Sequence, residues 1–205
     1  METPSSTPMK PQKARNSFDC AISSKQYLHG KTFVSVTDST RNTPIIFLHN
    51  VTGFMVGSKA EHAGIIKKGA QLVSAVSCSK VPHISVIVGA SYGAGNYAMC
   101  GRSYRPRFLF SWPCGRCSVM GPDQLAGVMG TIQKQGRDAA QAAKERDRLR
   151  DDVERDSQCY RTSAALLDDG VIDPRDTRDV LGMALEVVYS EPILGAASHQ
   201  ALARL

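Results

Sequence analysis

The stretch that decides the fold is GASYGAGNYAMCG, residues 89–101, which carries four glycines. The apolar run Ile84–Val88 precedes it and is typical of a strand, and a short helix through Met99 is expected to follow. A glycine turn between a strand and a helix presents backbone N–H groups at a helix N-terminus, where the peptide dipoles favour negative charge. The question is what approaches this backbone so closely that side chains are absent.

A second glycine turn, NVTGFMVG (residues 50–57), follows another apolar run, PIIFLHN (residues 44–50). Helical spacing of apolar residues predicts a helix over residues 59–79, which Pro82 ends before the next strand. Strand, helix and strand over so short a span form a βαβ unit with a right-handed crossover. The sequence therefore predicts an α/β fold.

The pattern continues beyond the glycine turn, with a strand predicted over residues 107–112 and a helix from Pro122 to about Met129. The charged residues 134–156 indicate a solvated helix or arm, because their signs alternate. A last helix is expected to open at Pro174.

Composition bounds the classes of function. With 205 residues, 42% of them hydrophobic and 21% charged, the chain suits one domain of ordinary size. The net charge of +6 is scattered and no DNA- or RNA-binding motif accompanies it, so we do not expect a nucleic-acid partner. No apolar run predicts membrane insertion or a secretory signal. We expect the first thirty residues to be a flexible or transit-like lead, and KTFVSVTD (residues 31–38) is consistent with one short strand.

Three other patterns are weak. Residues 93–98 match the dinucleotide fingerprint GxGxxA, but Phe110–Trp112 stand where an acidic residue would hold the ribose. Cys114 and Cys117 form one CxxC without the second pair that structural zinc needs, so neither metal nor redox work is expected. The two remaining candidates, His49 and His83, flank apolar runs and are interpreted as structural rather than as general bases.

Taken together, the two glycine turns predict a site for a developing oxyanion, because neighbouring strands would bring both sets of N–H donors to one edge of the sheet. The alternative is that the glycines only allow close packing of helix against strand, and both readings stay open. An oxyanion role at Gly95 leads us to expect that Gly95→Val blocks the site. Gly101 lies beyond the short helix, so Gly101→Ala is expected to be nearly silent.

Five separated motifs resemble the C-terminal carboxyltransferase domain of the biotin-dependent acyl-CoA carboxylases, and most of all the β subunits of methylcrotonoyl-CoA carboxylases. They are TPIIFLHNVTGFMVG (43–57), EHAGIIKKGAQLVSAVSCSKVP (61–82), GASYGAGNYAMCGRSYRPRFLFSWP (89–113), SVMGPDQLAGVM (118–129) and LLDDGVIDPRDTRDVLG (166–182). The resemblance implies a crotonase (ClpP-like) fold of stacked ββα units. Residues 43–205 would form the single carboxyltransferase C-domain, with a charged helical arm at about 133–157, and residues 1–42 stay unmatched.

The resemblance also implies the chemistry. In this family carboxybiotin loses CO2 in the site, charge develops on the biotin ureido oxygen, and the CO2 adds to an acyl-CoA. Matched to the family's motifs, the biotin-binding residues are Thr52, Gly53, Phe54, Tyr92, Gly93, Ala94 and Gly95. The oxyanion donors among them would be the backbone N–H groups of Phe54, Ala94 and Gly95. No metal is implied, and the expected substrate is 3-methylcrotonoyl-CoA, from leucine catabolism.

The implied partners are a biotin carboxylase and biotin carrier α subunit, and an N-terminal carboxyltransferase domain on another chain that binds the acyl-CoA. The chain would then hold half of a site, form homo- or hetero-oligomers and be inactive alone. The alternative is a truncated, non-catalytic paralogue that keeps only the fold and the oligomer contacts. The expected location is the mitochondrial matrix in a eukaryote and the cytoplasm in a bacterium.

Overall fold

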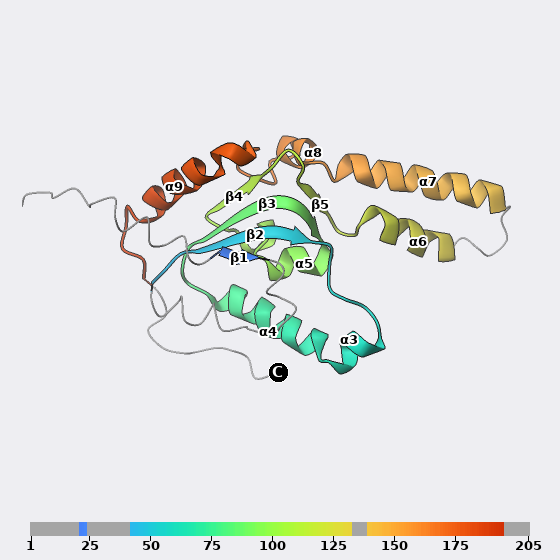
Figure 1. Cartoon of the computed structure of the whole chain (residues 1–205), viewed down its shortest axis with the longest axis horizontal. Helices are drawn as coiled ribbons and strands as arrows, with labels where there is room; N and C mark the ends of the chain where they lie inside the picture. The colour runs from blue at the N-terminus through green and yellow to red at the C-terminus, as the bar shows by residue number, and fades with distance from the viewer. Residues whose placement is uncertain (1–20, 24–41, 133–138, 195–205) are drawn as a thin grey trace, which may run out of the picture.

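The computed structural model describes residues 21–23, 42–132 and 139–194, and the predicted strand at 31–38 lies outside them. These residues form a five-stranded sheet in which every paired strand is parallel, with helices on both faces (Figure 1). No helix in the described ranges is long and apolar enough to cross a membrane.

The sheet has the order β1-β2-β3-β4, and β5 pairs with the far end of β3. The strands are β1 (Ala21–Ser23), β2 (Ile45–Val51), β3 (His83–Tyr92), β4 (Phe108–Ser111) and β5 (Arg116–Ser118). The helices are α3 (Ser58–His62), α4 (Ile65–Cys78), α5 (Gly93–Ala98), α6 (Pro122–Ile132), α7 (Ala139–Asp156), α8 (Cys159–Ala164) and α9 (Thr177–Val188). Short 3-10 turns occupy Arg102–Tyr104 and Pro174–Asp176.

The core has two layers because side chains of a strand alternate between the faces of a sheet. Ile45 and Phe47 of β2 face α4 and α5, where they join a buried cluster with Val76. Ile46, between them, faces α9 and packs in a second cluster with Leu185. Figure 1 shows α4 and α9 on opposite sides of the sheet accordingly. The sheet is thus covered on both faces. The two glycine turns lie at the carboxyl ends of its strands β2 and β3.

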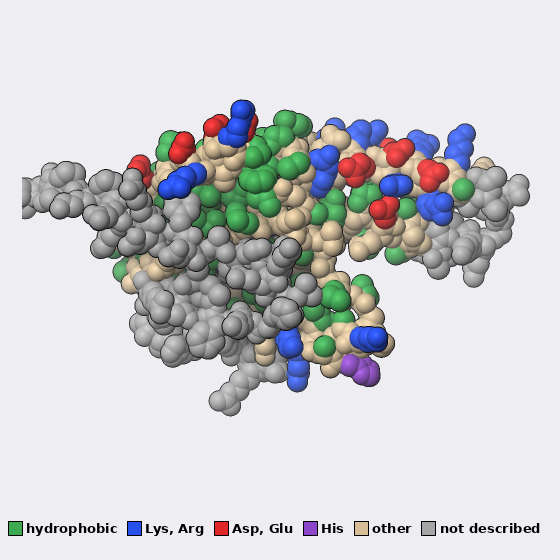
Figure 2. All heavy atoms as spheres, viewed as in Figure 1, with side chains coloured by type: hydrophobic (Ala, Val, Ile, Leu, Met, Phe, Trp, Pro, Cys, Tyr) green, Lys and Arg blue, Asp and Glu red, His purple; other side chains and the backbone are tan. Residues whose placement is uncertain are grey.

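The charged segment forms α7, which runs antiparallel beside α6 as a helical hairpin extending from the sheet (Figure 1). An ion pair of 3.1 Å between Arg150 and Asp123 joins the two helices. A second ion pair, Arg116 with Glu154, ties α7 to β5 at 3.1 Å. Figure 2 shows basic and acidic side chains interspersed over α7, whereas hydrophobic side chains gather between α9 and α8.

The predicted elements differ from the observed ones in several places. The helix expected over 59–79 is two helices, because Gly64 adopts a left-handed conformation with φ of 79° and breaks it. The strand expected over 84–88 extends to Tyr92, so Gly89 lies inside β3 and not in a turn. The strands β1 and β5 were not predicted, since three residues are too few for an alternating pattern. β1 also lies in the segment that we expected to be a flexible lead.

Candidate functional site

The two glycine turns meet at one edge of the sheet. β2 and β3 are parallel neighbours, so the turn after Val51 and the turn after Tyr92 leave the sheet at the same edge. A Cβ atom placed on Gly95 would lie 2.7 Å from Val51 Cγ2 and 3.4 Å from the Cα of Gly53. The helix α5 is therefore packed directly against the first turn, as a site built from both turns requires.

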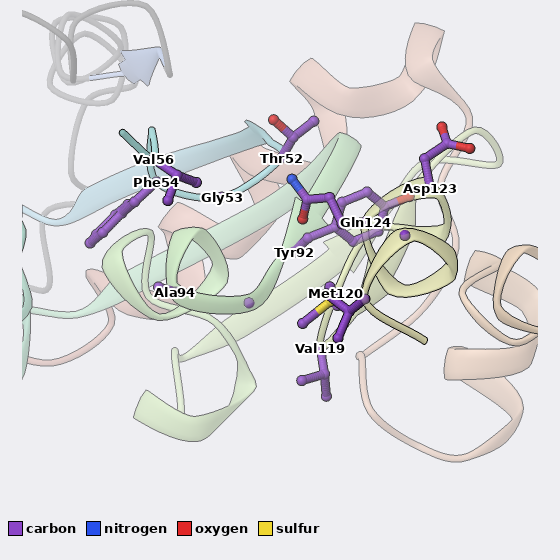
Figure 3. Close-up of a pocket in the computed structure, with 13 residues that line it drawn as sticks. Thr52, Gly53, Phe54, Val56, Tyr92, Ala94, Val119, Met120, Asp123 and Gln124 are labelled. Carbon is purple, nitrogen blue, oxygen red and sulfur yellow. The ribbon is translucent and has the colours of Figure 1, made fainter. Parts of the chain in front are cut away.

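A cavity of about 530 Å³ opens between the two turns and α6 (Figure 3). Its lining consists of Thr52, Gly53, Phe54, Val56, Tyr92, Gly93, Ala94, Val119, Met120, Asp123, Gln124, Gly127 and Val128. Every residue predicted to bind biotin is in this set except Gly95, which is buried behind it against Val51. The structure thus brings the predicted residues together around one space.

The wall contributed by α6 and the loop before it was missed by the sequence reasoning about the site. Figure 3 shows Gln124 beside Tyr92, with Asp123 farther out and Val119 and Met120 at the other end of the cavity. The segment 118–129 was recognised only as one of the family motifs. Its place opposite the glycine turns depends on the direction in which the chain leaves β5, which no local sequence pattern predicts.

The Phe54 side chain fixes the position of the first glycine turn. Its ring turns away from the cavity and packs on α4, where a Cβ on Gly69 would stand 3.0 Å from Phe54 Cζ and closer still to Cε2. The ring thereby anchors the first turn, while the backbone stays at the cavity. In the described part of the chain no backbone acceptor pairs with the Phe54 N–H.

The proposed donors at Ala94 and Gly95 belong to the first turn of α5, whose N–H groups have no acceptor within the helix. Ala94 is exposed to the cavity, whereas Gly95 is buried. Gly93 starts the helix with a φ of 51°, and a Cβ there would come within 2.8 Å of the Val119 carbonyl oxygen. A side chain at position 93 would therefore be doubly unfavourable.

The structure answers what approaches the glycine backbone, and at each position the neighbour is the chain itself. Asn50 Oδ1 lies 2.6 Å from the Cβ position of Gly89, and Val51 and Val119 occupy the corresponding space at Gly95 and Gly93. These contacts suit the packing alternative. The oxyanion role of the turns stays a prediction, because close packing and N–H donation are compatible at the same residues.

A steric contact opposes the expectation that Gly101→Ala is nearly silent, because the Asn96 side chain would have to move. Gly101 is buried, and a Cβ there would overlap the side-chain amide of Asn96. Asn96 folds back over Gly101, whose N–H donates to the Asn96 carbonyl at 2.9 Å. No local sequence pattern signals this contact, since it depends on the course of the chain after α5.

His49 is completely buried at the end of β2, and its Nδ1 lies 2.8 Å from Ser91 Oγ. Burial lowers the pKa of His49 to about 4, although a backbone group of Met99 raises it in part. Its Nε2 finds no hydrogen-bond partner of ordinary geometry among the described residues. The imidazole is therefore neutral near pH 7 and does not reach the cavity, which supports the structural role predicted for it.

His83 is likewise buried, with Nε2 3.0 Å from Ser79 Oγ and Nδ1 3.3 Å from Cys100 Sγ. Burial lowers the pKa of His83 to about 4 and raises the pKa of Cys100 to about 12. Both groups are thus uncharged near neutral pH. This environment also supports a structural histidine.

The two cysteines of the CxxC motif differ in their exposure to solvent. Cys114 is exposed and its Sγ donates to the Val88 carbonyl, whereas Cys117 lies on β5, where burial raises the pKa of its thiol. Both thiols are free. Within the described residues no group of three or more His, Cys, Asp or Glu side chains could hold a metal ion.

Comparison with known proteins shows which family the chain resembles. A family model described as the carboxyl transferase domain matches residues 24–202, beginning ahead of the predicted boundary at residue 43. The mitochondrial methylcrotonoyl-CoA carboxylase beta chain of Arabidopsis thaliana is 49% identical over 173 residues, 81% of this chain and 29% of that protein. A probable biotin-dependent acyl-coenzyme A carboxylase beta2 subunit of Mycobacterium tuberculosis is 49% identical over 164 residues, 77% of this chain and 31% of that protein.

Solved structures agree. The β subunit of geranyl-CoA carboxylase from P. aeruginosa superposes with a TM-score of 0.74 at 36% identity, covering 93% of this chain and 35% of that one. Transcarboxylase 12S gives a TM-score of 0.70 at 29% identity, covering 83% and 32%. The chain spans about a third of the length of these relatives. The predicted α/β crotonase fold is confirmed, and the chain belongs to the carboxyl transferase domain family, which includes β subunits of biotin-dependent acyl-CoA carboxylases.

Proposed function

We propose that the chain is the biotin-binding part of an acyl-CoA carboxyltransferase. The observation that carries this proposal is that both glycine turns line one cavity, to which Phe54 and Ala94 contribute, and that no backbone acceptor among the described residues pairs with the Phe54 N–H. Backbone donors at a helix start suit an oxygen that gains negative charge during a reaction. The proposed donors are backbone N–H groups, and the polar side chains of the lining, among them Thr52, Asp123 and Gln124, stand around them.

The cavity fits a compact ring system such as that of biotin. Its volume of about 530 Å³ lies within the range of roughly 300–1,000 Å³ that small-molecule pockets occupy. The walls are mostly apolar, and the polar groups are few and convergent, as ring recognition with one oriented oxygen requires. Thr52, Asp123 and Gln124 contribute polar side chains to the lining (Figure 3).

Carboxybiotin, when bound, supplies the carboxyl group as CO2 and leaves negative charge on its ureido oxygen. The chain would orient this oxygen toward the two turns, so that the N–H groups of Phe54, Ala94 and Gly95 donate to it. Gly53 and Gly93 keep the approach open because no side chain stands between the donors and the ring. The packing of Gly95 on Val51 fixes the spacing between the two sets of donors.

The similarity to methylcrotonoyl-CoA carboxylase beta chains supports 3-methylcrotonoyl-CoA as the substrate. We further propose that a biotinylated α subunit delivers the carboxyl group and that an N-terminal carboxyltransferase domain on another chain holds the acyl-CoA. Exposed hydrophobic side chains on α4 and α9, such as Ile66 at 69% and Met183 at 59% exposure, support contacts with other chains. Three relatives from eukaryotes are mitochondrial by name, which supports the mitochondrial matrix for a eukaryotic source.

The test is to combine the chain with an N-terminal carboxyltransferase domain, a biotin carboxylase and a biotinylated carrier, and to measure fixation of labelled bicarbonate into 3-methylcrotonoyl-CoA. Ala94→Leu places a side chain in the cavity, and we expect the rate to fall roughly a hundredfold with little change in melting temperature. The matched control is Ala164→Leu, at an exposed alanine of the equally short helix α8, and it should keep the parent rate.

Two outcomes would contradict the proposal. A parent mixture that fixes no carbon on any acyl-CoA, while a full-length relative does so under the same conditions, would favour a protein that keeps the fold without the reaction. Full activity of Ala94→Leu would remove the cavity from the reaction even if the parent is active.

A further inference from the structure

We propose that Asn96 and Ser91 are positioning residues, which hold α5 in the orientation that turns its first N–H groups into the cavity. This inference rests on the proposed function for its consequence in the reaction. Neither residue lines the cavity, so each would act through the backbone of α5 and not by touching biotin.

The side-chain amide of Asn96 joins α5 to two strands. Its Nδ2 donates to Ser91 Oγ of β3 at 2.9 Å and lies 3.7 Å from Cys117 Sγ of β5. Ser91 and Cys117 are paired neighbours in the sheet, so one amide reaches both strands at the point where they pair. The helix is thereby fixed to the sheet immediately next to the proposed donor Gly95.

His49 continues this chain of hydrogen bonds into the core. Ser91 is fully buried, and its Oγ lies between Asn96 Nδ2 and His49 Nδ1, at 2.9 and 2.8 Å. With Asn96 donating to it, the Ser91 hydroxyl has its own proton free for Nδ1 of the neutral imidazole. The series Asn96, Ser91, His49 then runs from donor to acceptor throughout and links α5 to the core.

The opposite side of α5 is fixed by packing. Gly95 rests on Val51 and Gly53, so the helix is clamped between the first turn and the Asn96 contact. Because α5 has only six residues, its own hydrogen bonds give it little rigidity, and these external contacts set its orientation. Releasing Asn96 should let the helix rotate and move the Ala94 and Gly95 N–H groups away from the cavity.

The experiment compares Asn96→Ala, Ser91→Ala and the double variant, each in the full chain. Thr162→Val is the control, because it removes one buried hydroxyl on α8, whose hydrogen bond to the Cys159 carbonyl is 2.9 Å. Amide hydrogen exchange of residues 93–98 measures the rigidity of α5 and does not require the protein to be enzymatically active. In the reconstituted enzyme, kcat and the KM for the biotinylated carrier report the consequence for the reaction.

We expect each single variant to speed exchange in residues 93–98 roughly tenfold and to lower kcat by a similar factor. The double variant should lose less than the product of the two single losses, because both single variants remove the shared hydrogen bond between Asn96 and Ser91. Thr162→Val should lower the melting temperature without either effect. Unchanged exchange in both single variants, or losses that multiply in the double variant, would overturn the inference. If the parent fixes no carbon, the proposed function fails, whereas the exchange measurement still decides the role of Asn96 and Ser91.

Discussion

Gly95 of α5 lies directly on Val51 of β2, so that a Cβ atom on Gly95 would stand 2.7 Å from Val51 Cγ2 and 2.9 Å from Cγ1. Contacts that short require the Val51 side chain, the helix or the strand end to shift. The residue whose N–H we propose as a donor is therefore also a packing residue. A bulky substitution such as Gly95→Val disturbs both properties and cannot separate them.

Gly95→Ala is expected to lower the free energy of unfolding by about 1–3 kcal/mol, because the added methyl overpacks the contact with Val51. Adding Val51→Ala removes both methyl groups that the new Cβ meets. The double variant should then be more stable than the sum of the two single losses predicts, as measured by urea unfolding. Strictly additive losses would show that Gly95 is constrained by something other than Val51.

Gly127 of α6 allows the opposite cavity wall to be tested without a steric penalty. It lines the cavity, and a Cβ there would meet no atom within 4 Å. Gly127→Leu should therefore fill the cavity and reduce carboxylation, while helix propensity raises stability by up to about 1 kcal/mol. Gly182→Leu is the matched control, since Gly182 of α9 has equally open surroundings and lies outside the cavity lining. Equal activity of both variants would contradict the assignment of this cavity.

Much of the fold was accessible from local pattern. The apolar runs at β2 and β3 are long enough to be recognised, and Pro82 marks the boundary between α4 and β3. The break at Gly64 was not predicted, because the apolar spacing continues on both sides of a glycine that adopts φ of 79°. The strand β5 is stabilised by pairing with β3 and not by its own sequence.

Part of the candidate site could likewise be predicted from the sequence and part could not. The two glycine turns are visible in the sequence because each follows a recognisable strand, and parallel pairing places them together. The contacts of Asn96 with Ser91 and Cys117 were not predictable, because three elements must come together before they exist. The α6 wall with Gln124 depends on the same long-range arrangement.

Gly101→Ala is expected to be harmful through Asn96. The new Cβ would overlap the Asn96 amide, which must then leave Ser91 and Cys117. We expect a lower melting temperature and faster exchange in α5, in the same direction as Asn96→Ala. Because Asn96→Ala removes the overlapping atoms, adding Gly101→Ala to it should cost little more. A large additional loss in that double variant would mean that Gly101 is constrained by another neighbour.

The two buried histidines predict a loss of stability in mild acid. The pKa values of His49 and His83 are lowered from 6.5 to about 4 in the folded chain, mainly by burial, so the unfolded chain binds their protons more tightly. The free energy of unfolding is therefore highest, with respect to these two groups, above pH 6.5. It decreases as the pH falls toward 4, by at most about 3 kcal/mol per histidine.

Urea unfolding at pH 7.5, 6.0 and 5.0 measures this dependence. The free energy of unfolding should fall with decreasing pH, and His49→Gln and His83→Gln should each reduce the slope by about one proton, or about 1.4 kcal/mol per pH unit. His49 is the sharper case, because its Nδ1 lies 2.8 Å from Ser91 Oγ, and a proton on Nδ1 would require the Ser91 hydroxyl to turn and accept. A free energy of unfolding that stays constant between pH 7.5 and 5.0 would show that both imidazoles gain a proton without leaving the fold.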